Sequence, residues 1–460
     1  MNQQEKIKHL YARAGFGIHF QELKKIKKQS VEKAVDSLFS ASAKYKDISI
    51  VEEPSQEVPY QTLTAEEKRE RQKQYTEQTR ALNYAFLDKL AFGEDALREK
   101  MTLFFHGHFA CRLQNSPYHI QELNNVQRKY ALGNFKALSV AVSQSRAMLS
   151  FLNNQQNRKG KPNENFAREL MELFTLGVGH YTEEDVKAAA RAFTGWRYNQ
   201  ESKFEFNPKL HDDGVKTFFG KTGRFNGQDI MDMIFERKQV AYFIAGKLYR
   251  FFVNERENEQ HIKELGDFFY ERNYEIKPLL QKMFTADWFY DAVNVGTKIK
   301  SPIEFIVGLN KQFYIHYENK AVLLKFQQAL GQTLFYPPNV AGWPSGKEFI
   351  DSSSLMLRLK IPSTVINNGV LEFDGKADPE DEALIALARK ESTKVAQRTK
   401  AHVDWDKFVK GLPADLDNRE LATFLLQSPV TATLLSNISP SSDLKTKVVQ
   451  ILSTPEYQLC

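Results

Sequence analysis

The chain has 460 residues, of which 42% are hydrophobic and 26% charged, so it carries enough apolar material for a large core. Its 63 Lys and Arg against 57 Asp and Glu give a net charge of +6, which is too dilute to indicate the basic face of a nucleic-acid-binding protein. Because the only cysteines are Cys111 and Cys460, the sequence predicts neither a disulfide framework nor a cysteine metal cluster.

The first residues, "MNQQEKIKHLYARAGFG", lack the apolar core of a signal peptide. No apolar run in the sequence approaches the ~18 residues that a membrane-spanning helix needs. The sequence as it stands therefore predicts a cytoplasmic protein without a transmembrane segment. A chain whose leader had been removed would look the same, so export stays open.

Helical patterns begin at the N-terminus and dominate the chain. The pattern of residues 1–62 predicts a helical segment packed on the core. The pattern of residues 63–365 predicts the main helical core. The first long helix of that core begins at Thr64, which has Glu67 three residues on, the spacing of a capping box. The first half of this helix is nearly all polar, so we expect it to project into solvent before Gly93 ends the helix.

Two further segments have clear helical signatures. The sequence "ALREKMTLFFHGHF" spaces its apolar residues at i, i+4, i+7 and i+8, which is typical of an amphipathic helix. The sequence "TEEDVKAAARAF" begins with the N-cap candidate Thr182, and Asp185 follows three residues later. Gly195 comes after the last turn, as a glycine at a helix C-terminus does.

The pattern changes between residues 197 and 227, where short alternating pieces surround Asp213 and Gly214. An Asp-Gly pair between such pieces indicates a hairpin turn. We therefore expect a small β-hairpin excursion near residues 197–227, inserted in an otherwise helical protein.

The sequence "LFYPPNVAGWP" contains Pro337, Pro338 and Pro344, which remove backbone donors and fix φ. It predicts an ordered, Pro-rich aromatic loop. Residues 366–460 then predict a polar linker and a C-terminal helical tail. The predicted fold class is therefore mainly α, a multi-helical globular core with one small β-hairpin excursion and this loop.

The stretch "NENFARELMELF" carries the most concentrated polar pattern. We expect one helix with Asn163 as N-cap, in which Glu164, Arg168 and Glu172 share the solvent face at i, i+4 and i+8. Two exposed ion pairs would result. Glu169 instead falls at the border of the apolar stripe, where a carboxylate needs a partner or costs stability.

Two hypotheses explain why Glu169 lies at the border of the apolar stripe. Glu169 and Glu172 project within ~60° of each other and could hold one cation or one water molecule. Arg168 could instead keep either carboxylate ionised within a structural network.

The motif "HGH" raises a similar choice. In an unbroken helix His106 and His108 point ~200° apart, and they converge only if Gly107 breaks the helix. Each histidine is either a buried side chain bonded to a backbone carbonyl, a metal ligand or a proton-transfer group. His211 and Asp212 precede a turn, so they are either surface turn residues or part of a site carried on a loop.

If these groups converge, imidazole and carboxylate ligands would suit zinc, iron or manganese. Such a divalent metal could activate water for hydrolysis, and iron could serve redox chemistry. The candidate metal ligands are His106, His108, Glu169 and His211. The candidate catalytic residues are Glu169, Glu172, Arg168, His211 and Asp212.

Several motifs resemble one bacterial family, the Domain of Unknown Function 1800 family. They are, in chain order, "HLYARAGFG", "MTLFFHGHFA", "NENFARELMELFTLGVGHYTEEDVKAAARAFTGW", "LHDDGVKTFFG", "KSPIEF" and "GQTLFYPPNVAGWP". The resemblance implies a family whose members are largely uncharacterised, often exported and often encoded beside proteins that resemble alkaline phosphatases. This chain departs from it in lacking an apparent leader.

Two classes of function therefore stay open. The first is a metal-assisted hydrolase or related enzyme centred on His108, Glu169 and His211, acting on a small polar substrate. The second is a non-catalytic helical protein that binds a partner or takes part in an assembly, and whose polar motifs are structural. An enzyme should bring the three side chains to a shared point in a pocket, whereas a scaffold should leave them separated and satisfied by other partners.

Overall fold

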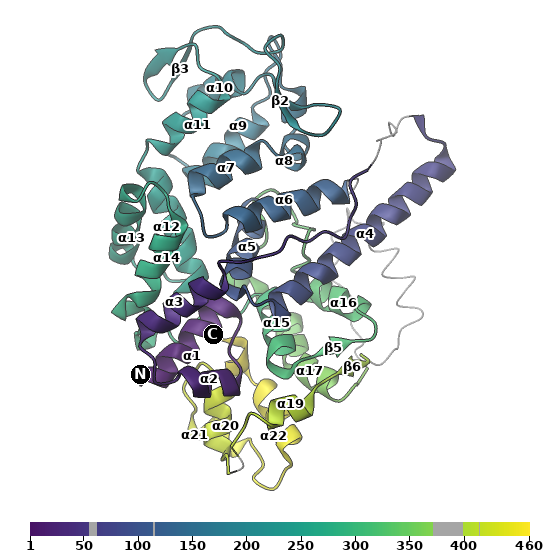
Figure 1. The fold of residues 1–460 in the computed structure, drawn as a ribbon, viewed down its shortest axis with the longest axis vertical. Coiled ribbons are helices and arrows are strands. Elements are labelled where there is room, and N and C mark those ends of the chain that lie inside the picture. Colours follow the sequence, from purple (N-terminus) through teal and green to yellow (C-terminus); the bar gives the residue numbers. More distant parts are fainter. Residues whose placement is uncertain (55–61, 114–115, 371–398, 414) are drawn as a thin grey trace.

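A computed structural model describes residues 1–54, 62–113, 116–370, 399–413 and 415–460 of the chain. The described residues are mainly helical, and their strands are two or three residues long and pair in two-stranded antiparallel sheets, so the predicted mainly α class is confirmed. Figure 1 shows the N-terminal and C-terminal helices together at one end of the molecule, with β2 and β3 at the other end.

The N-terminal helices surround a central buried helix. Both α1 and α3 pack on α5, and α4 packs on α5 and on α15, which comes much later in the chain. The first five helices are α1 (Gln3–Gly15), α2 (Phe20–Ile26), α3 (Val31–Ala41), α4 (Ala65–Phe92) and α5 (Ala96–His108).

The long helix α4 follows the sequence prediction closely. Thr64 is its N-cap and forms a capping box with Glu67, and Gly93 is its C-cap. Its buried residues all lie at or after Thr79, and Figure 1 shows the first half of the helix extending away from the body of the molecule. A polar first half has no apolar stripe to bury, so only the second half packs.

The middle of the chain continues with short helices. α6 packs against α5 and α7, and α8 packs against β1. Their bounds are α6 (Pro117–Tyr130), α7 (Phe135–Ser143), α8 (Arg146–Phe151), α9 (Asn165–Glu169) and α10 (Glu183–Ala192).

The stretch predicted as one α-helix has two parts. After α9 the chain forms a π-helix over Leu170–Thr175, and Glu164 rather than Asn163 is the N-cap residue. The buried Thr175 hydroxyl donates to the carbonyl of Leu170, five residues back, at 2.6 Å. The predicted N-cap was therefore wrong by one residue. The extra residue per turn of the π-helix also moves every side chain that follows away from the position that α-helical spacing predicts.

The β excursion contains two hairpins rather than one. β1 (Trp196–Tyr198) pairs with β2 (Phe204–Phe206), and β3 (Lys216–Phe218) pairs with β4 (Lys221–Gly223). The turn of the second hairpin lies at Phe219 and Gly220, both with positive φ.

The predicted hairpin turn at Asp213 and Gly214 was wrong. There the Gly214 N–H donates to the carboxylate of Asp212 at 2.9 Å, which is a local turn before β3.

The second half of the chain is helical again. It contains α11 (Gly227–Phe235), α12 (Gln239–Phe252), α13 (Glu259–Glu271), α14 (Ile276–Thr285), α15 (Pro302–Phe313), α16 (Ala321–Leu330), α17 (Ser352–Ile366), α19 (Trp405–Val409), α20 (Asn418–Leu425), α21 (Ala432–Ser436) and α22 (Leu444–Leu452). The strands β5 (His316–Tyr317) and β6 (Ala401–His402) pair with each other. Short 3-10 turns cover Asn154–Gln156, Asp287–Tyr290, Ala292–Asn294, Gly346–Phe349 and Pro455–Gln458.

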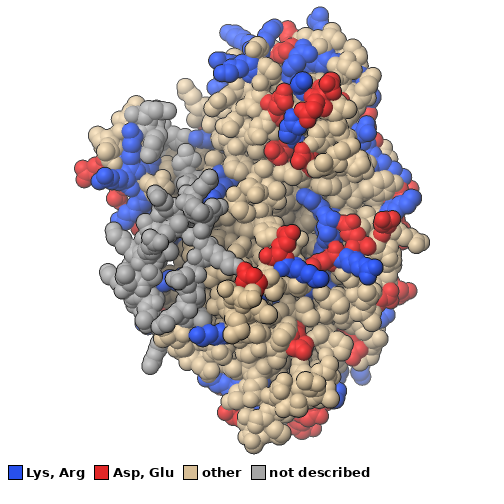
Figure 2. Space-filling model, turned by 180° about the vertical axis from the view of Figure 1, so that it is seen from behind, with Lys and Arg blue, Asp and Glu red and all other residues tan. Residues whose placement is uncertain are grey.

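The Pro-rich loop is irregular as predicted, with neither helix nor strand over residues 334–345. Most of the predicted polar linker lies outside the described residues. The C-terminal segment returns to the core, where Leu459 forms an antiparallel bridge with Ile299, just before α15. None of the described helices is long and apolar enough to cross a membrane. On the face in Figure 2, basic and acidic side chains are interspersed.

Candidate functional site

The two histidines of "HGH" lie on one unbroken helix and do not converge. α5 runs through Gly107 to His108, so the break that convergence required is absent from this helix. His106 is buried, and its Nε2 accepts a hydrogen bond from the backbone N–H of Phe335 at 3.0 Å. Burial lowers the pKa of His106 to about 3, which makes it a neutral acceptor for the Pro-rich loop.

His108 has a different set of partners. Its Nδ1 accepts from the ammonium group of Lys247 at 3.1 Å, and its Nε2 lies 3.1 Å from the carbonyl oxygen of Phe174. Since Nδ1 accepts, the ring proton is on Nε2 and is donated to that carbonyl. Lys247 also donates to the carbonyl of Leu173 at 3.2 Å, so the pair holds two carbonyls of the π-helix. Burial, with the Lys247 charge beside it, lowers the pKa of His108.

Arg168 forms a surface network that is only partly the predicted one. It contacts Glu164 at 3.3 Å, as the i, i+4 spacing predicts, and it holds both oxygens of Glu183 on α10 at 2.7 Å. The predicted partner Glu172 instead accepts a hydrogen bond from the hydroxyl of Tyr181. The π-helix explains the difference, because Glu172 follows the point where the α-helical spacing is lost.

Glu169 stays at the border of the buried stripe, as predicted. Among the described residues no hydrogen bond or ion pair is made by its side chain, which is only partly exposed. Burial, and then the charge of Glu172, raise the pKa of Glu169. It is a carboxylate that accepts a proton more readily than usual, on a solvent-accessible edge.

His211 and Asp212 belong to a third group. His211 Nδ1 lies 3.0 Å from the carbonyl oxygen of Thr194, at the end of α10. Asp212 accepts from Arg191 at 2.8 and 3.2 Å, and this pairing lowers the pKa of Asp212 to about 2. Both residues therefore fasten the β3 segment to α10.

The predicted metal ligands are thus distributed over separate hydrogen-bonded groups. His106 holds the Pro-rich loop, His108 holds the π-helix, and His211 holds the end of α10. All four predicted ligands belong to the part of the chain that the structure describes. In that part, no group of three His, Cys, Asp or Glu side chains is placed so that it could hold a metal ion.

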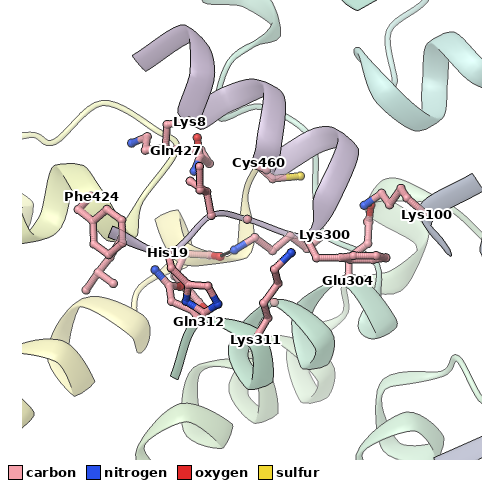
Figure 3. A pocket seen from close by; sticks show the side chains of 17 residues that line it. Lys8, His19, Lys100, Lys300, Glu304, Lys311, Gln312, Phe424, Gln427 and Cys460 are labelled. Atoms are coloured by element: carbon pink, nitrogen blue, oxygen red, sulfur yellow. Dashed lines mark hydrogen bonds and ion pairs between the residues drawn. The ribbon is translucent and has the colours of Figure 1, made fainter. Parts of the chain in front are cut away.

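A pocket that the sequence did not reveal lies elsewhere, where α1, α15 and the C-terminal segment meet. It encloses about 620 Å³ of empty space, including its opening to solvent. Figure 3 shows lysines from several elements around it. Its ionisable lining includes Lys8, Lys100, Lys300, Lys311, His19 and Glu304.

Local structure explains how the lysines reach the pocket. α1 ends in a left-handed turn at Phe16 and Gly17, with φ of 61° and 106°. The ammonium of Lys311 donates to the carbonyl of Gly15 at 2.7 Å, at this C-terminal end of α1. Lys8 in turn donates to the carbonyl of Leu426 at 2.5 Å, at the C-terminal end of α20. A cation is favourable at both positions because helix C-termini carry unpaired carbonyls.

The third ammonium group, that of Lys300, lies against the C-terminal segment. It donates to the carbonyl of Tyr457 at 2.7 Å and lies 3.9 Å from the centre of the Tyr457 ring. Burial lowers the pKa values of Lys8, Lys300 and Lys311 to about 8 in each case. All three therefore stay mainly protonated at pH 7.

The carboxylate side chain in this lining, that of Glu304, is already paired. Glu304 contacts the ammonium of Lys100 at 2.6 Å and that of Lys298 at 2.7 Å. These two charges hold the pKa of Glu304 below its usual range, although burial alone would raise it. His19 adds no charge at neutral pH, because burial lowers its pKa to about 4. Cys460 also lines the pocket, and a negative charge there raises the pKa of Lys300. The four lysines of the lining outnumber these two negative groups, so the pocket is cationic overall.

Some signal for this pocket was present in the sequence. Lys300 begins the motif "KSPIEF", which also contains Glu304, and Lys8 immediately precedes "HLYARAGFG". These motifs are separated by more than half the length of the chain, so only the folded structure shows that their lysines line one pocket.

The family comparison agrees with the motifs. The model of the family described as "Protein of unknown function (DUF1800)" matches residues 9–459, which is nearly the whole chain. No curated protein and no solved structure matches this chain. The chain therefore belongs to the DUF1800 family.

Proposed function

We propose that this protein is a binding protein whose ligand is a small organic anion, held in the lysine-lined pocket. The observation that carries the proposal is that Lys8, Lys300 and Lys311 all line one cavity. This is the binding class of the two that the sequence left open. The separation of His106, His108 and His211 supports that class over a shared metal centre.

The charge balance supports an anionic ligand. Glu304 is paired with Lys100 and Lys298. The charges of Glu304 and Cys460 only partly compensate Lys300, whose pKa stays lowered by burial. An ammonium group has three N–H donors, and Lys300 and Lys311 each use one on a backbone carbonyl. Their remaining donors are available to a carboxylate or phosphate, and the partial exclusion of water strengthens such contacts.

The rest of the lining indicates what the anion is attached to. Phe16, Ile18 and Phe424 line the same pocket and offer an apolar wall. The amide oxygen of Gln427, also in the lining, is buried without a hydrogen-bond partner among the described residues, so a donor on the ligand would satisfy it. We infer a ligand with one anionic end and an apolar or aromatic body, for which benzoate is a simple probe.

Thermal unfolding in the presence of anions tests this proposal, because a ligand that binds only the folded state raises Tm with its concentration. We expect benzoate to raise Tm saturably at constant ionic strength, with a smaller effect of inorganic phosphate and none of chloride. Lys300→Gln should abolish the benzoate effect. Lys24→Gln, which removes the same charge from the exposed side of α2, is the matched control and should keep it. Equal shifts in both variants would contradict the proposal.

The metal-assisted hydrolase remains a prediction of the sequence. Glu169 supports a proton-transfer role on its own, because its carboxylate is partly buried and its pKa is raised.

A further inference from the structure

The side chain of Lys311 is placed differently from the other lysines of the pocket. It lies one turn after Gly308 on α15, and both residues line the cavity. Gly308 has no side chain, and a Cβ added there would have Phe16 O as its nearest contact at 3.6 Å. The glycine therefore leaves space beside Lys311, and Figure 3 shows the Lys311 amine directed into the middle of the pocket.

We propose that Lys311 forms an imine with an anionic aldehyde or 2-oxo acid bound in this pocket. The inference rests on the proposed function, because the carboxylate of that ligand would be held by the other ammonium groups. It adds a covalent step and restricts the ligand to a carbonyl compound.

The other two lysines are better suited to hold the carboxylate. Lys300 faces the ring of Tyr457, and a cation–π contact favours its charged form. Lys8 donates to two carbonyl groups, of Thr423 and Leu426, which leaves it a single free N–H. Lys311 contacts one carbonyl, that of Gly15, and its side chain remains partly accessible. Among the three, it is the amine that neither faces the Tyr457 ring nor donates to two carbonyl groups.

The environment of Lys311 also supplies the neutral amine that the reaction needs. With a pKa of about 8, roughly 10% of this side chain is unprotonated at pH 7, which is on the order of 300 times the fraction of an ordinary lysine. Burial is the main cause, while the charge of Glu22 raises the pKa and that of Lys100 lowers it further. A desolvated lysine near other cations is a known way to activate this nucleophile.

The proposed step balances without any oxidant or reductant. The Lys311 nitrogen attacks the carbonyl carbon, a C–N bond forms, and the carbonyl oxygen takes up the proton that the nitrogen loses. The resulting carbinolamine then loses water to give the imine. His19, which lines the same pocket as Lys311 and is neutral at pH 7, can relay this proton.

Reductive trapping tests the proposal on the whole protein. Glyoxylate and cyanoborohydride are added at pH 7, and peptide mapping locates the carboxymethyl group that reduction leaves on an amine. We expect labelling of Lys311 at least tenfold faster than of exposed Lys24, and suppression of the Lys311 label by benzoate. Equal labelling of the two lysines, or a Lys311 label that benzoate does not change, would overturn the inference.

The wild type separates this inference from the proposed function. Lys311→Arg keeps the positive charge but removes the nucleophile, so the label in that peptide should be lost. If the wild type is stabilised by benzoate but is not labelled at Lys311, the proposal of an imine is wrong and the proposal of anion binding is kept. If neither benzoate stabilisation nor selective labelling is seen in the wild type, both proposals fail. The wild-type readouts decide the matter even if the variant does not fold.

Discussion

Lys100 on α5 and Glu304 on α15 form an ion pair at 2.6 Å, and their side chains are only 1% and 4% exposed. The pair joins the helix that carries "HGH" to the helix that carries Lys311, although some 200 residues separate them in sequence. Lys298 contacts the same carboxylate from just before α15. This buried group therefore fixes one side of the pocket to the centre of the core.

Removing the carboxylate of this group should be costly. In Glu304→Gln two buried ammonium groups lose their counter-charge, and breaking a buried pair costs about 3 to 5 kcal/mol. Urea unfolding at pH 7 measures the loss. Glu318→Gln, which removes a carboxylate from the exposed contact with Lys400, is the control and should change stability far less. Equal effects of the two substitutions would show that the buried pair does not hold the fold.

The buried amine of Lys311 should make the free energy of unfolding change with pH in the alkaline range. Its pKa is about 8 in the folded protein against a reference value of 10.5, so between these values the unfolded chain binds more protons and stability rises with pH. Lys311→Met lacks this contribution. From pH 7 to pH 10.5 the stability of the wild type relative to the variant should therefore increase, by up to about 3 kcal/mol. A difference independent of pH, in denaturant titrations at both values, would show that Lys311 is not desolvated.

The affinity for benzoate should depend on pH in the opposite direction. The anion needs protonated amines, and the lysines of the pocket lose their protons as pH rises through about 8. The dissociation constant should change little between pH 6 and 7 and increase several-fold by pH 9. Titration at constant ionic strength checks this. Binding that strengthens with pH would indicate that neutral amines, rather than charged ones, hold the ligand.

Metal analysis tests the hydrolase prediction of the sequence. In protein purified without chelator or affinity-tag metal, the anion-binding account expects less than one metal ion per chain. Glu169→Gln should then be near neutral in stability, while His108→Ala should be destabilised because Lys247 and the Phe174 carbonyl lose a partner. Stoichiometric metal that both substitutions remove would instead favour the enzyme and revive the predicted centre.

The π-helix gives a structural prediction. Thr175→Val keeps the size of the side chain but leaves the buried carbonyl of Leu170 without its 2.6 Å hydrogen bond. We expect a loss of about 1 to 3 kcal/mol in thermal or urea unfolding. An unchanged stability would mean that the segment can return to ordinary α-helical geometry at no cost.

Local signals in the sequence predicted much of the fold. The capping boxes at Thr64 and Thr182 are present. The apolar spacing predicted α5 as a helix, but its charged residues Arg98, Glu99 and Lys100 are buried as well, so the expected polar face was wrong. These signals depend on neighbours three or four residues apart, which a sequence displays directly. The π-helix escaped prediction because its apolar residues, Leu170 and Phe174, also fit an ordinary α-helix.

The candidate site was harder to predict, because its groups come from distant parts of the chain. The conspicuous polar residues, such as His106 and His211, bind backbone groups of loops and helix ends. The pocket depends on lysines beside apolar motifs, and a lysine in a sequence gives no sign that it will be buried. Only the meeting of α1, α15 and the C-terminal segment reveals that Lys8, Lys300 and Lys311 face one cavity.

The most direct measurement is a calorimetric titration of benzoate into the wild type, Lys300→Gln and the control Lys24→Gln, all at pH 7 and one ionic strength. The account predicts one site per chain in the wild type and in the control. It also predicts a loss of at least about tenfold in affinity for Lys300→Gln, since a charged hydrogen bond contributes roughly 1.5 to 3 kcal/mol. Absence of saturable binding, or equal affinity in all three proteins, would contradict the claim that this pocket holds an anion.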